Sequence, residues 1–230
     1  MDSKPYVSWG LPGPDARQIG LERGCFNMLR VPDYESGVSA ACHFLRKGLA
    51  LDERVAVVAF DNSEALLARF AACGFSFDTH LQSEELLYYY YKPSFSRTLS
   101  FTPDYDRLFQ ELMRLSGRAI SRIVFFNSET LINLQSPHLV RESLQLLVSA
   151  TSNRAYTCLG FYVPQTDLMD VDLHGTCKSY LPGYFSLNRM PEGEAGEFLL
   201  RDEKSSPGAG GLDIRLEMPS GSWKPEKQII

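Results

Sequence analysis

Residues 28–49, MLRVPDYESGVSAACHFLRKGL, contain a short apolar run, a turn and the start of a helix. A strand, a loop and a helix in this order build a phosphate-binding P-loop, and the pattern G-x-x-x-x-G-K-[ST] fits this stretch without a gap. Gly37 matches the second glycine, and Ser39 matches the hydroxyl residue. Pro32 stands where the pattern has its first glycine, and Val38 stands where it has lysine. The stretch is therefore either a disabled nucleotide site or a chance match to the P-loop pattern.

Length and composition predict one globular domain. The chain has 230 residues, of which 44% are apolar and 22% charged, which is enough to bury a core. The net charge of -5 is mild and no basic run stands out, so the charge does not indicate binding to nucleic acid. The five cysteines are odd in number, widely spaced and without zinc spacing, which is typical of reduced thiols in a cytosolic protein.

The chain carries no pattern of a secretory signal or a membrane span. Its first residues lack a basic segment followed by an apolar stretch, and no apolar run approaches the roughly 20 residues that a spanning helix needs. We therefore expect a cytoplasmic protein that does not insert directly into a membrane.

Strand patterns and helix patterns alternate along most of the chain. Strands are predicted at 25–31, 54–60, 85–91, 121–128 and 155–163, and helices at 35–50, 62–74, 104–117 and 136–153. The last strands, at 184–190, 197–203 and 212–218, are separated by glycine-rich turns. This order predicts an α/β fold with a mainly parallel central sheet, helices on both faces and a C-terminal antiparallel meander. We expect one domain over 24–218, between a lead-in at 1–23 and a flexible tail at 219–230.

The order of these elements resembles the RecA-like ATPases, in their KaiC-like branch, over about residues 20–218. The segments that carry the resemblance are FLRKGLALDERVAVVAFD, RIVFFNSETLI at the position of the Walker B strand, and the closing hairpins SYLPGYFSLNRMPEGEAGEFLLRDEKSSPGAGGLDIRLEM. The stretches FNMLRVPDYESGVSAACHFL, RVAVVAFDNSEALLARF and ELLYYY are also similar to the N-terminal domain of the bacterial cellulose-biosynthesis protein BcsE and to the MEDS sensory domain.

Three positions that serve phosphoryl transfer in that family have changed here. Val38 cannot neutralise the β and γ phosphates as the P-loop lysine does, and Pro32 lacks a backbone donor. The Walker B position holds Asn127, followed by Ser128, and an amide is a poor substitute for the carboxylate that organises magnesium. Asp61 is the one acidic group still in place, where KaiC-like enzymes often carry the residue that activates water. The resemblance thus implies a pseudo-ATPase without catalytic residues or cofactor.

The loop itself is expected to keep the place of a P-loop and to lose its shape. Asp33 and Glu35 bring negative charge to a position where a triphosphate already brings about four charges. Tyr34 offers a ring that fills space otherwise open to phosphate. Glu35 and Ser36 lie at the helix start, where a carboxylate is favoured and can satisfy the free N–H groups. We therefore predict a site that is capped from within.

Each of these residues also has an ordinary structural interpretation. Gly37 and Ser39 fit the start of any helix, since serine is a common cap. Asn127 and Ser128 are common turn formers at the end of a strand. Asp61 precedes a predicted helix and fits a helix cap.

The resemblance implies a non-catalytic regulatory or scaffold protein of a bacterial cellulose or exopolysaccharide secretion system, and thus a role in biofilms. It implies self-association and protein partners, among them a MinD-like ATPase. The R-x-G-D motif that binds cyclic-di-GMP in the BcsE family is absent, so that ligand is not implied. The alternatives are a nucleotide-binding ATPase with a non-standard P-loop and a small-ligand sensory domain.

Two further expectations concern loops. The segment 166–177, TDLMDVDLHGTC, has three aspartates and no complete calcium-loop pattern, so we expect a solvated acidic loop. Large apolar residues expected in turns are candidate anchors for protein contacts: Phe75, Phe77, Phe95 and Tyr184.

Overall fold

The computed structural model describes residues 6–11, 14, 20–60, 63–91, 104–117, 119–126, 128–134, 136–152, 156–164, 168–190, 197–204 and 214–217. Their strands are β1 (Tyr6–Ser8), β2 (Gly20–Glu22), β3 (Phe26–Arg30), β4 (Val55–Ala59), β5 (Leu86–Tyr90), β6 (Arg122–Phe125), β7 (Thr157–Tyr162), β8 (Gly183–Arg189), β9 (Glu197–Asp202) and β10 (Ile214–Glu217). Their helices are α2 (Tyr34–Leu49), α3 (Ser63–Ala72), α4 (Phe77–Gln82), α5 (Tyr105–Ser116), the 3-10 turn η1 (Ser128–Leu131), α6 (Pro137–Ser152) and α7 (Leu168–Tyr180).

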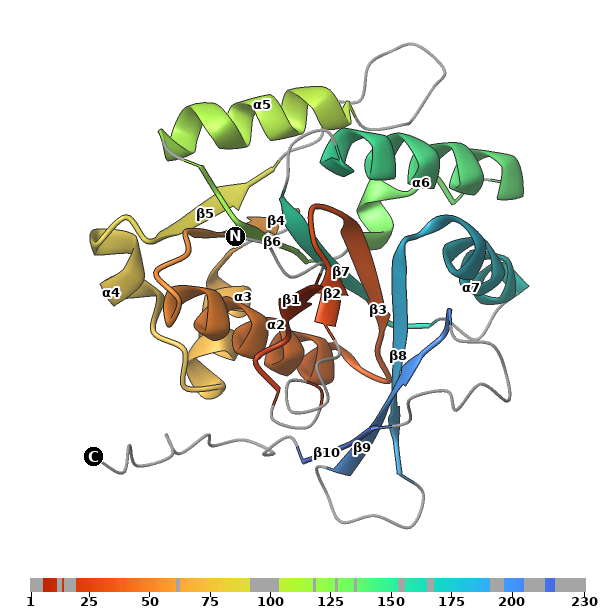
Figure 1. Cartoon of the computed structure of the whole chain (residues 1–230), viewed down its shortest axis with the longest axis horizontal. Helices are drawn as coiled ribbons and strands as arrows, with labels where there is room; N and C mark the ends of the chain where they lie inside the picture. The colour runs from red at the N-terminus through yellow and green to blue at the C-terminus, as the bar shows by residue number, and fades with distance from the viewer. Residues whose placement is uncertain are drawn as a thin grey trace.

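The centre of the molecule is an eight-stranded sheet in the order β10-β9-β8-β3-β7-β6-β4-β5 (Figure 1). The neighbours from β8 through β3, β7, β6 and β4 to β5 all pair in parallel. At the other end, β9 pairs antiparallel with both β8 and β10. The predicted α/β class, the mainly parallel sheet and the C-terminal antiparallel meander are therefore confirmed.

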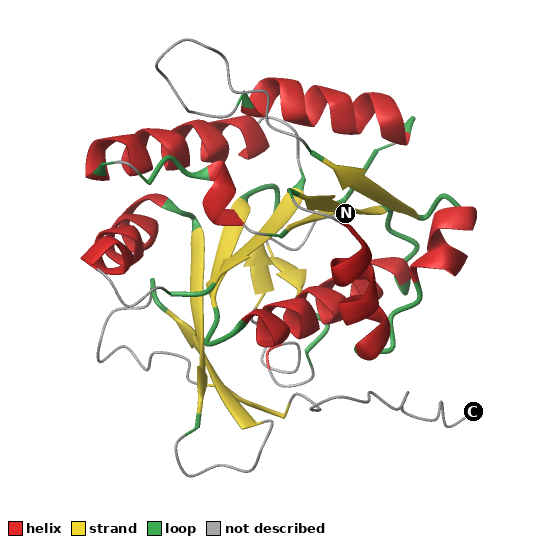
Figure 2. Cartoon of the chain, turned by 180° about the vertical axis from the view of Figure 1, so that it is seen from behind, coloured by secondary structure: helices red, strands yellow, loops and turns green. Residues whose placement is uncertain are grey.

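Helices cover both faces of the sheet because the chain crosses it in two directions. From β3 the chain moves outward to β4 and β5, and then returns through β6 and β7 to β8. Right-handed crossovers place the helices of opposite directions on opposite faces. Accordingly, α2 and α3 pack on one face, while α5, α6 and α7 pack on the other (Figures 1 and 2).

The sequence explains why the central strands lie between two helical layers. All five residues of β4, VAVVA, are buried. Val55 and Val57 belong to the core cluster under α2, whereas Ala56 and Val58 belong to the cluster under α5 and α6. A continuous apolar run is the pattern of a parallel strand with both faces covered.

Helix α5 shows how local signals set an element's ends. The side chain of Asp104 accepts a hydrogen bond from the backbone N–H of Arg107 at 2.9 Å, which caps the N-terminus. Gly117 ends the helix in the left-handed conformation with φ 62, which costs glycine little. The predicted helix at 104–117 is thus confirmed.

Helix α7 lies where we expected an acidic loop, so that prediction was wrong. Its apolar residues are too few to give a strong periodic pattern, and glycine and aspartate disfavour a helix. Leu173, Cys177 and Leu181 are nevertheless buried in the cluster on the second face. Burial of residues spaced four apart on one side therefore outweighs a weak local propensity.

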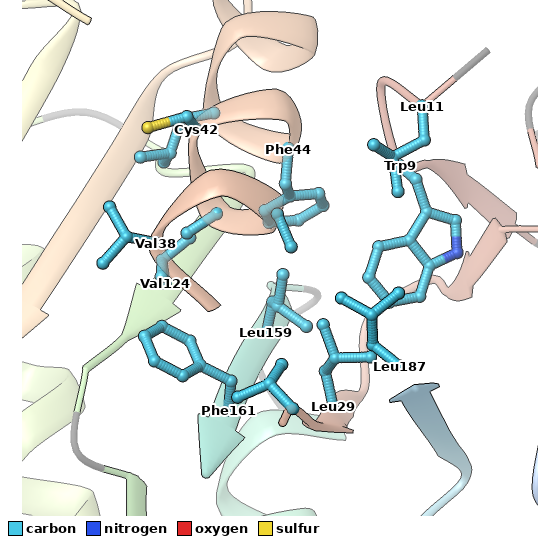
Figure 3. Packing of buried hydrophobic residues seen from close by; sticks show 14 of the residues in the cluster. Trp9, Leu11, Leu29, Val38, Cys42, Phe44, Val124, Leu159, Phe161 and Leu187 are labelled. Atoms are coloured by element: carbon cyan, nitrogen blue, oxygen red, sulfur yellow. The ribbon is translucent and has the colours of Figure 1, made fainter. Parts of the chain in front are cut away.

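The N-terminal segment packs onto the sheet. Strands β1 and β2 form an antiparallel pair, and Trp9 behind them is fully buried. Its indole meets the ring of Phe185 edge to face, with ring centroids 5.1 Å apart. Figure 3 shows Trp9 beside Leu187 and Leu29, across from Phe44 of α2. The N-terminal segment is thus part of the core cluster under α2.

Two of the expected contact anchors are buried. Phe75 is 2% exposed and packs against Phe70, with ring centroids 5.6 Å apart. Tyr184 is fully buried in β8. The proposal that these two side chains anchor a protein contact was therefore wrong, because both belong to the core. The side chains of Phe77 and Phe95 lie outside the described residues.

Candidate functional site

The candidate site lies where β3 and β7 end beside one another. Val31 donates its N–H to the carbonyl oxygen of Tyr162 at 3.0 Å, which holds the two strand ends together. The chain leaves β3 toward α2 on one face and leaves β7 toward α7 on the other. In open α/β sheets, ligands bind at the carboxyl ends of strands where neighbouring connections diverge in this way. The loop of residues 31–33, which joins β3 to α2, therefore occupies the position expected of a ligand site.

Asp33 closes the N-terminus of α2. Its Oδ1 accepts hydrogen bonds from the N–H and the hydroxyl of Ser36, both at 2.8 Å. Its Oδ2 accepts two more from Arg189 at the end of β8, with distances of 2.6 Å from Nη2 and 3.2 Å from Nε. Burial alone would raise the pKa of Asp33, but the hydrogen bonds from Ser36 and Arg189 and the arginine charge bring that pKa below its ordinary value.

Gly37 is the point of closest approach between α2 and the sheet. A Cβ atom at this position would lie 2.4 Å from two ring carbons of Phe161 on β7. Figure 3 shows the Phe161 ring below the start of α2, with Val38 between it and Cys42. Val38 is 1% exposed and belongs to the apolar core. Gly37, which matches the P-loop glycine, therefore packs against an aromatic ring of the sheet. Val38, at the position of the P-loop lysine, is a buried aliphatic side chain.

The side chains of Tyr34 and Glu35 link the helix start to α3. The Tyr34 ring packs against Phe161 and Phe126, with centroid distances of 5.7 and 6.4 Å. The Arg69 guanidinium lies 4.8 Å from the centre of the Tyr34 ring and pairs with the Glu35 carboxylate. Tyr34 thus fills space beneath the helix. The group that caps the first turn is Asp33, whereas Glu35 is turned outward to Arg69.

The remaining predicted residues do not all gather at this loop. Pro32 and Ser39 are half-buried beside it. Ser128 is fully buried and donates its hydroxyl to the carbonyl oxygen of Phe125 at 3.0 Å. A Cβ atom placed on Gly160 would lie 2.6 Å from this hydroxyl oxygen and would also meet the Phe26 ring, which belongs to the core cluster under α5 and α6. Ser128 therefore lies on the sheet face opposite to α2. Asp61 and Asn127 lie outside the described residues.

Three side chains that complete the candidate site were missed from the sequence: Arg69, Phe161 and Arg189. Arg189 pairs with a residue 156 positions earlier in the chain. The available signal was its place at the end of a predicted strand of the meander. Phe161 was visible only as one apolar residue of a buried strand, and nothing in the sequence paired it with Gly37.

The arrangement leaves the helix N-terminus already occupied by a carboxylate. An anion that approached the first N–H groups of α2 would meet the Asp33 carboxylate, which already accepts a hydrogen bond from the N–H of Ser36. Among the described residues, no group of three or more His, Cys, Asp or Glu side chains could hold a metal ion. The helices in that part of the chain include none with the length and apolar character to cross a bilayer.

A hollow in the surface lies at the opposite edge of the sheet. It has a volume of about 350 Å³ and is lined by residues at the amino ends of β4, β5 and β6, including Glu53, Arg54 and Glu85. Parallel sheets bind their ligands at the carboxyl ends of the strands. We therefore place the candidate site at Asp33 and not at this hollow.

Comparison with protein-family models gives no match to the chain, and comparison with curated protein sequences gives no relative.

The contact between Gly37 and Phe161 predicts a stability difference between two glycine substitutions. Gly37→Ala should lower the free energy of unfolding by about 1–3 kcal/mol, because the new methyl group overlaps the ring. The matched control is Gly175→Ala in α7, where a Cβ meets nothing within 4 Å, and this variant should be neutral or gain about 0.5–1 kcal/mol. Denaturant unfolding measures both. An undiminished stability in Gly37→Ala would contradict the packing role of Gly37.

The pair of Asp33 and Arg189 predicts a pH-dependent contribution to stability. Because the folded-state pKa of Asp33 is lowered, the stabilisation is complete above the unfolded pKa of about 3.9 and is lost as the pH falls through the folded value. Asp33→Asn keeps a good N-cap and removes the charge. It should therefore cost about 1 kcal/mol at pH 7, and this cost should disappear as the pH falls through the lowered folded-state pKa.

The stability cost of Asp33→Asn is then measured again in a chain that also carries Arg189→Gln. There the cost of Asp33→Asn at pH 7 should shrink, because the ion pair is already absent. A cost that is the same at pH 7 and in acid below the folded-state pKa would show that the charge of Asp33 does not stabilise the loop.

Proposed function

We propose that the chain is a non-catalytic relative of the RecA-like and KaiC-like ATPases that works by binding other proteins. The observation that carries this proposal is the packing at the start of α2, where Val38 at the lysine position is buried in the apolar core and Gly37 lies against the Phe161 ring. No cation replaces the P-loop lysine at Val38. The Asp33 carboxylate supports the proposal, because it accepts a hydrogen bond from the N–H of Ser36 at the helix end where a P-loop binds phosphate.

The surface near β5 supports a role in protein contacts. Strand β5 is the last strand at one end of the described sheet. Four of the seven exposed large apolar side chains found among the described residues lie on α4, β5 and α5: Leu81, Tyr90, Met113 and Leu115. Exposed apolar side chains on an edge strand and on the helices beside it are typical of interaction sites. We propose that this edge surface binds a second copy of the chain.

The wider role follows from the resemblance to the BcsE N-terminal domain. On that basis the protein is a regulatory or scaffold component of a bacterial cellulose or exopolysaccharide secretion system, with a MinD-like ATPase as its protein partner. A nucleotide-binding ATPase with a non-standard loop and a small-ligand sensory domain are the competing functions, and binding measurements separate them.

Calorimetry with ATP and magnesium tests the non-catalytic part of the proposal. We expect no binding in the micromolar range, because the lysine position is aliphatic and the helix N-terminus carries its own carboxylate. Micromolar binding that weakens in Ser39→Ala, but not in the exposed control Ser149→Ala on α6, would instead identify an active nucleotide site. Turnover of ATP by the wild-type chain would have the same meaning.

Light scattering at increasing protein concentration tests the edge surface. The wild-type chain should form a dimer, and the double substitution Tyr90→Lys with Met113→Glu should return it to a monomer, because the two charges oppose burial of the edge. The matched control is Leu146→Glu, a similarly exposed apolar residue on α6, which should leave the dimer intact. A monomeric wild-type protein at high concentration would contradict self-association.

A further inference from the structure

Two cysteines that are distant in the sequence meet between α2 and α3. Cys42 is buried in the middle of α2, and Cys73 is half-buried directly after the last residue of α3. The side chain of Cys73 packs against the buried cluster that contains Cys42, and each thiol affects the pKa of the other. Figure 3 shows Cys42 on the same side of α2 as Val38, away from Phe44 and Trp9. The two thiol groups are therefore neighbours at the contact between α2 and α3.

An arginine fixes the surroundings of this pair. Arg46, one turn after Cys42 on α2, donates from Nη2 to the carbonyl oxygen of Cys73 at 2.8 Å. Its guanidinium also lies 5.7 Å from the centre of the Phe75 ring. These contacts hold the end of α3 against α2 and place a positive charge beside the Cys73 thiol. Positive charge beside a partly exposed thiol favours the reactive thiolate.

The charges around Cys73 have opposing effects. The hydrogen bond from Cys42 and the charge of Arg46 lower the pKa of Cys73, whereas partial burial and the charge of Glu35 raise it, and the result is a pKa of about 7. The C-terminus of α3 also disfavours a negative charge. Burial raises the pKa of Cys42 far above its ordinary value, so Cys42 remains a thiol. The pair thus combines one thiolate former with one protonated neighbour.

Cys25 offers a direct comparison within the same chain. Like Cys73, it is half-buried. Burial and the nearby Glu22 raise its pKa. The two cysteines thus have similar exposure and opposite electrostatic surroundings.

We propose that Cys73 is a site of oxidation by hydroperoxides and that Cys42 is its resolving partner. In the first step, the Cys73 thiolate attacks an oxygen of hydrogen peroxide, the O–O bond breaks, hydroxide leaves, and Cys73 becomes a sulfenic acid. In the second step, the Cys42 sulfur attacks the Cys73 sulfur, the S–O bond breaks, and water leaves with the Cys42 proton. The two sulfurs together lose two electrons, and the peroxide is reduced to water and hydroxide.

A bridge between these residues would act on the candidate site through α3. Arg69 lies one turn before Cys73 on α3 and pairs with Glu35 in the first turn of α2. A disulfide would hold the end of α3 to the middle of α2 and thereby restrain the loop that contains Asp33. This inference does not depend on the proposed protein-binding function.

Alkylation and peroxide oxidation of the folded wild-type chain, each followed by peptide mass spectrometry, test the site. At pH 7, alkylation of Cys73 should be about ten-fold faster than that of Cys25, because about half of Cys73 is thiolate. Hydrogen peroxide should give a Cys42–Cys73 peptide pair lighter by two hydrogen atoms, which a thiol reductant reverses. Equal reactivity of Cys25 and Cys73, or oxidation without the bridged peptide, would overturn the proposal.

Two variants separate the roles of the two cysteines. Cys42→Ala should stop the reaction at the sulfenic acid of Cys73, which dimedone traps, and Cys73→Ser should abolish both products. Cys25→Ser is the matched control and should form the bridge at the wild-type rate. Because the wild-type mapping needs no substitution, a variant that fails to fold leaves the test intact. A bridge that still forms in Cys73→Ser, through another cysteine, would refute the assignment.

Discussion

The guanidinium of Arg122 holds together parts of the chain that are far apart in sequence. This side chain is 1% exposed, pairs with the Glu53 carboxylate, and donates to the carbonyl oxygens of Ser8 at 2.7 Å and Phe44 at 3.2 Å. It also lies over the Phe44 ring. Strand β6, helix α2, the turn after α2 and the N-terminal β1 strand thus share one buried charge. Removing one partner of such a pair typically costs about 3–5 kcal/mol, so the position of α2 is strongly fixed.

Two glycines let α2 lie close to the sheet. A Cβ at Gly48 would be 2.8 Å from Arg122, and a Cβ at Gly37 would be 2.4 Å from Phe161. These glycines are about three helical turns apart and therefore lie on the same side of α2. The glycine that matches the phosphate-binding pattern thus has the same role as Gly48, which lies outside the pattern. Close helix packing explains Gly37 without a phosphate.

The sequence was informative where a pattern is local. The buried runs of β4, β6 and β7 and the capped helix α5 follow directly from apolar runs, an aspartate cap and a glycine stop. The contacts that close the candidate site are not local, because Arg189 and Phe161 reach the start of α2 from strands far along the chain. Helix α7 was missed for a related reason, since its stability comes from burial against the sheet and not from its own residues.

The magnitudes indicate which feature opposes nucleotide binding most. Displacing Asp33 would remove an N-cap worth about 1 kcal/mol, a favourable helix-end charge of about 0.3–1 kcal/mol, and an exposed ion pair with Arg189 of at most about 1 kcal/mol. A total of about 1.3–3 kcal/mol weakens binding by about 10- to 150-fold, which a tightly bound nucleotide would tolerate. The larger obstacle is therefore the core itself. Val38 and the Phe161 ring occupy the helix start with apolar groups that cannot compensate phosphate charge, and those groups cannot move without opening the packing beneath α2.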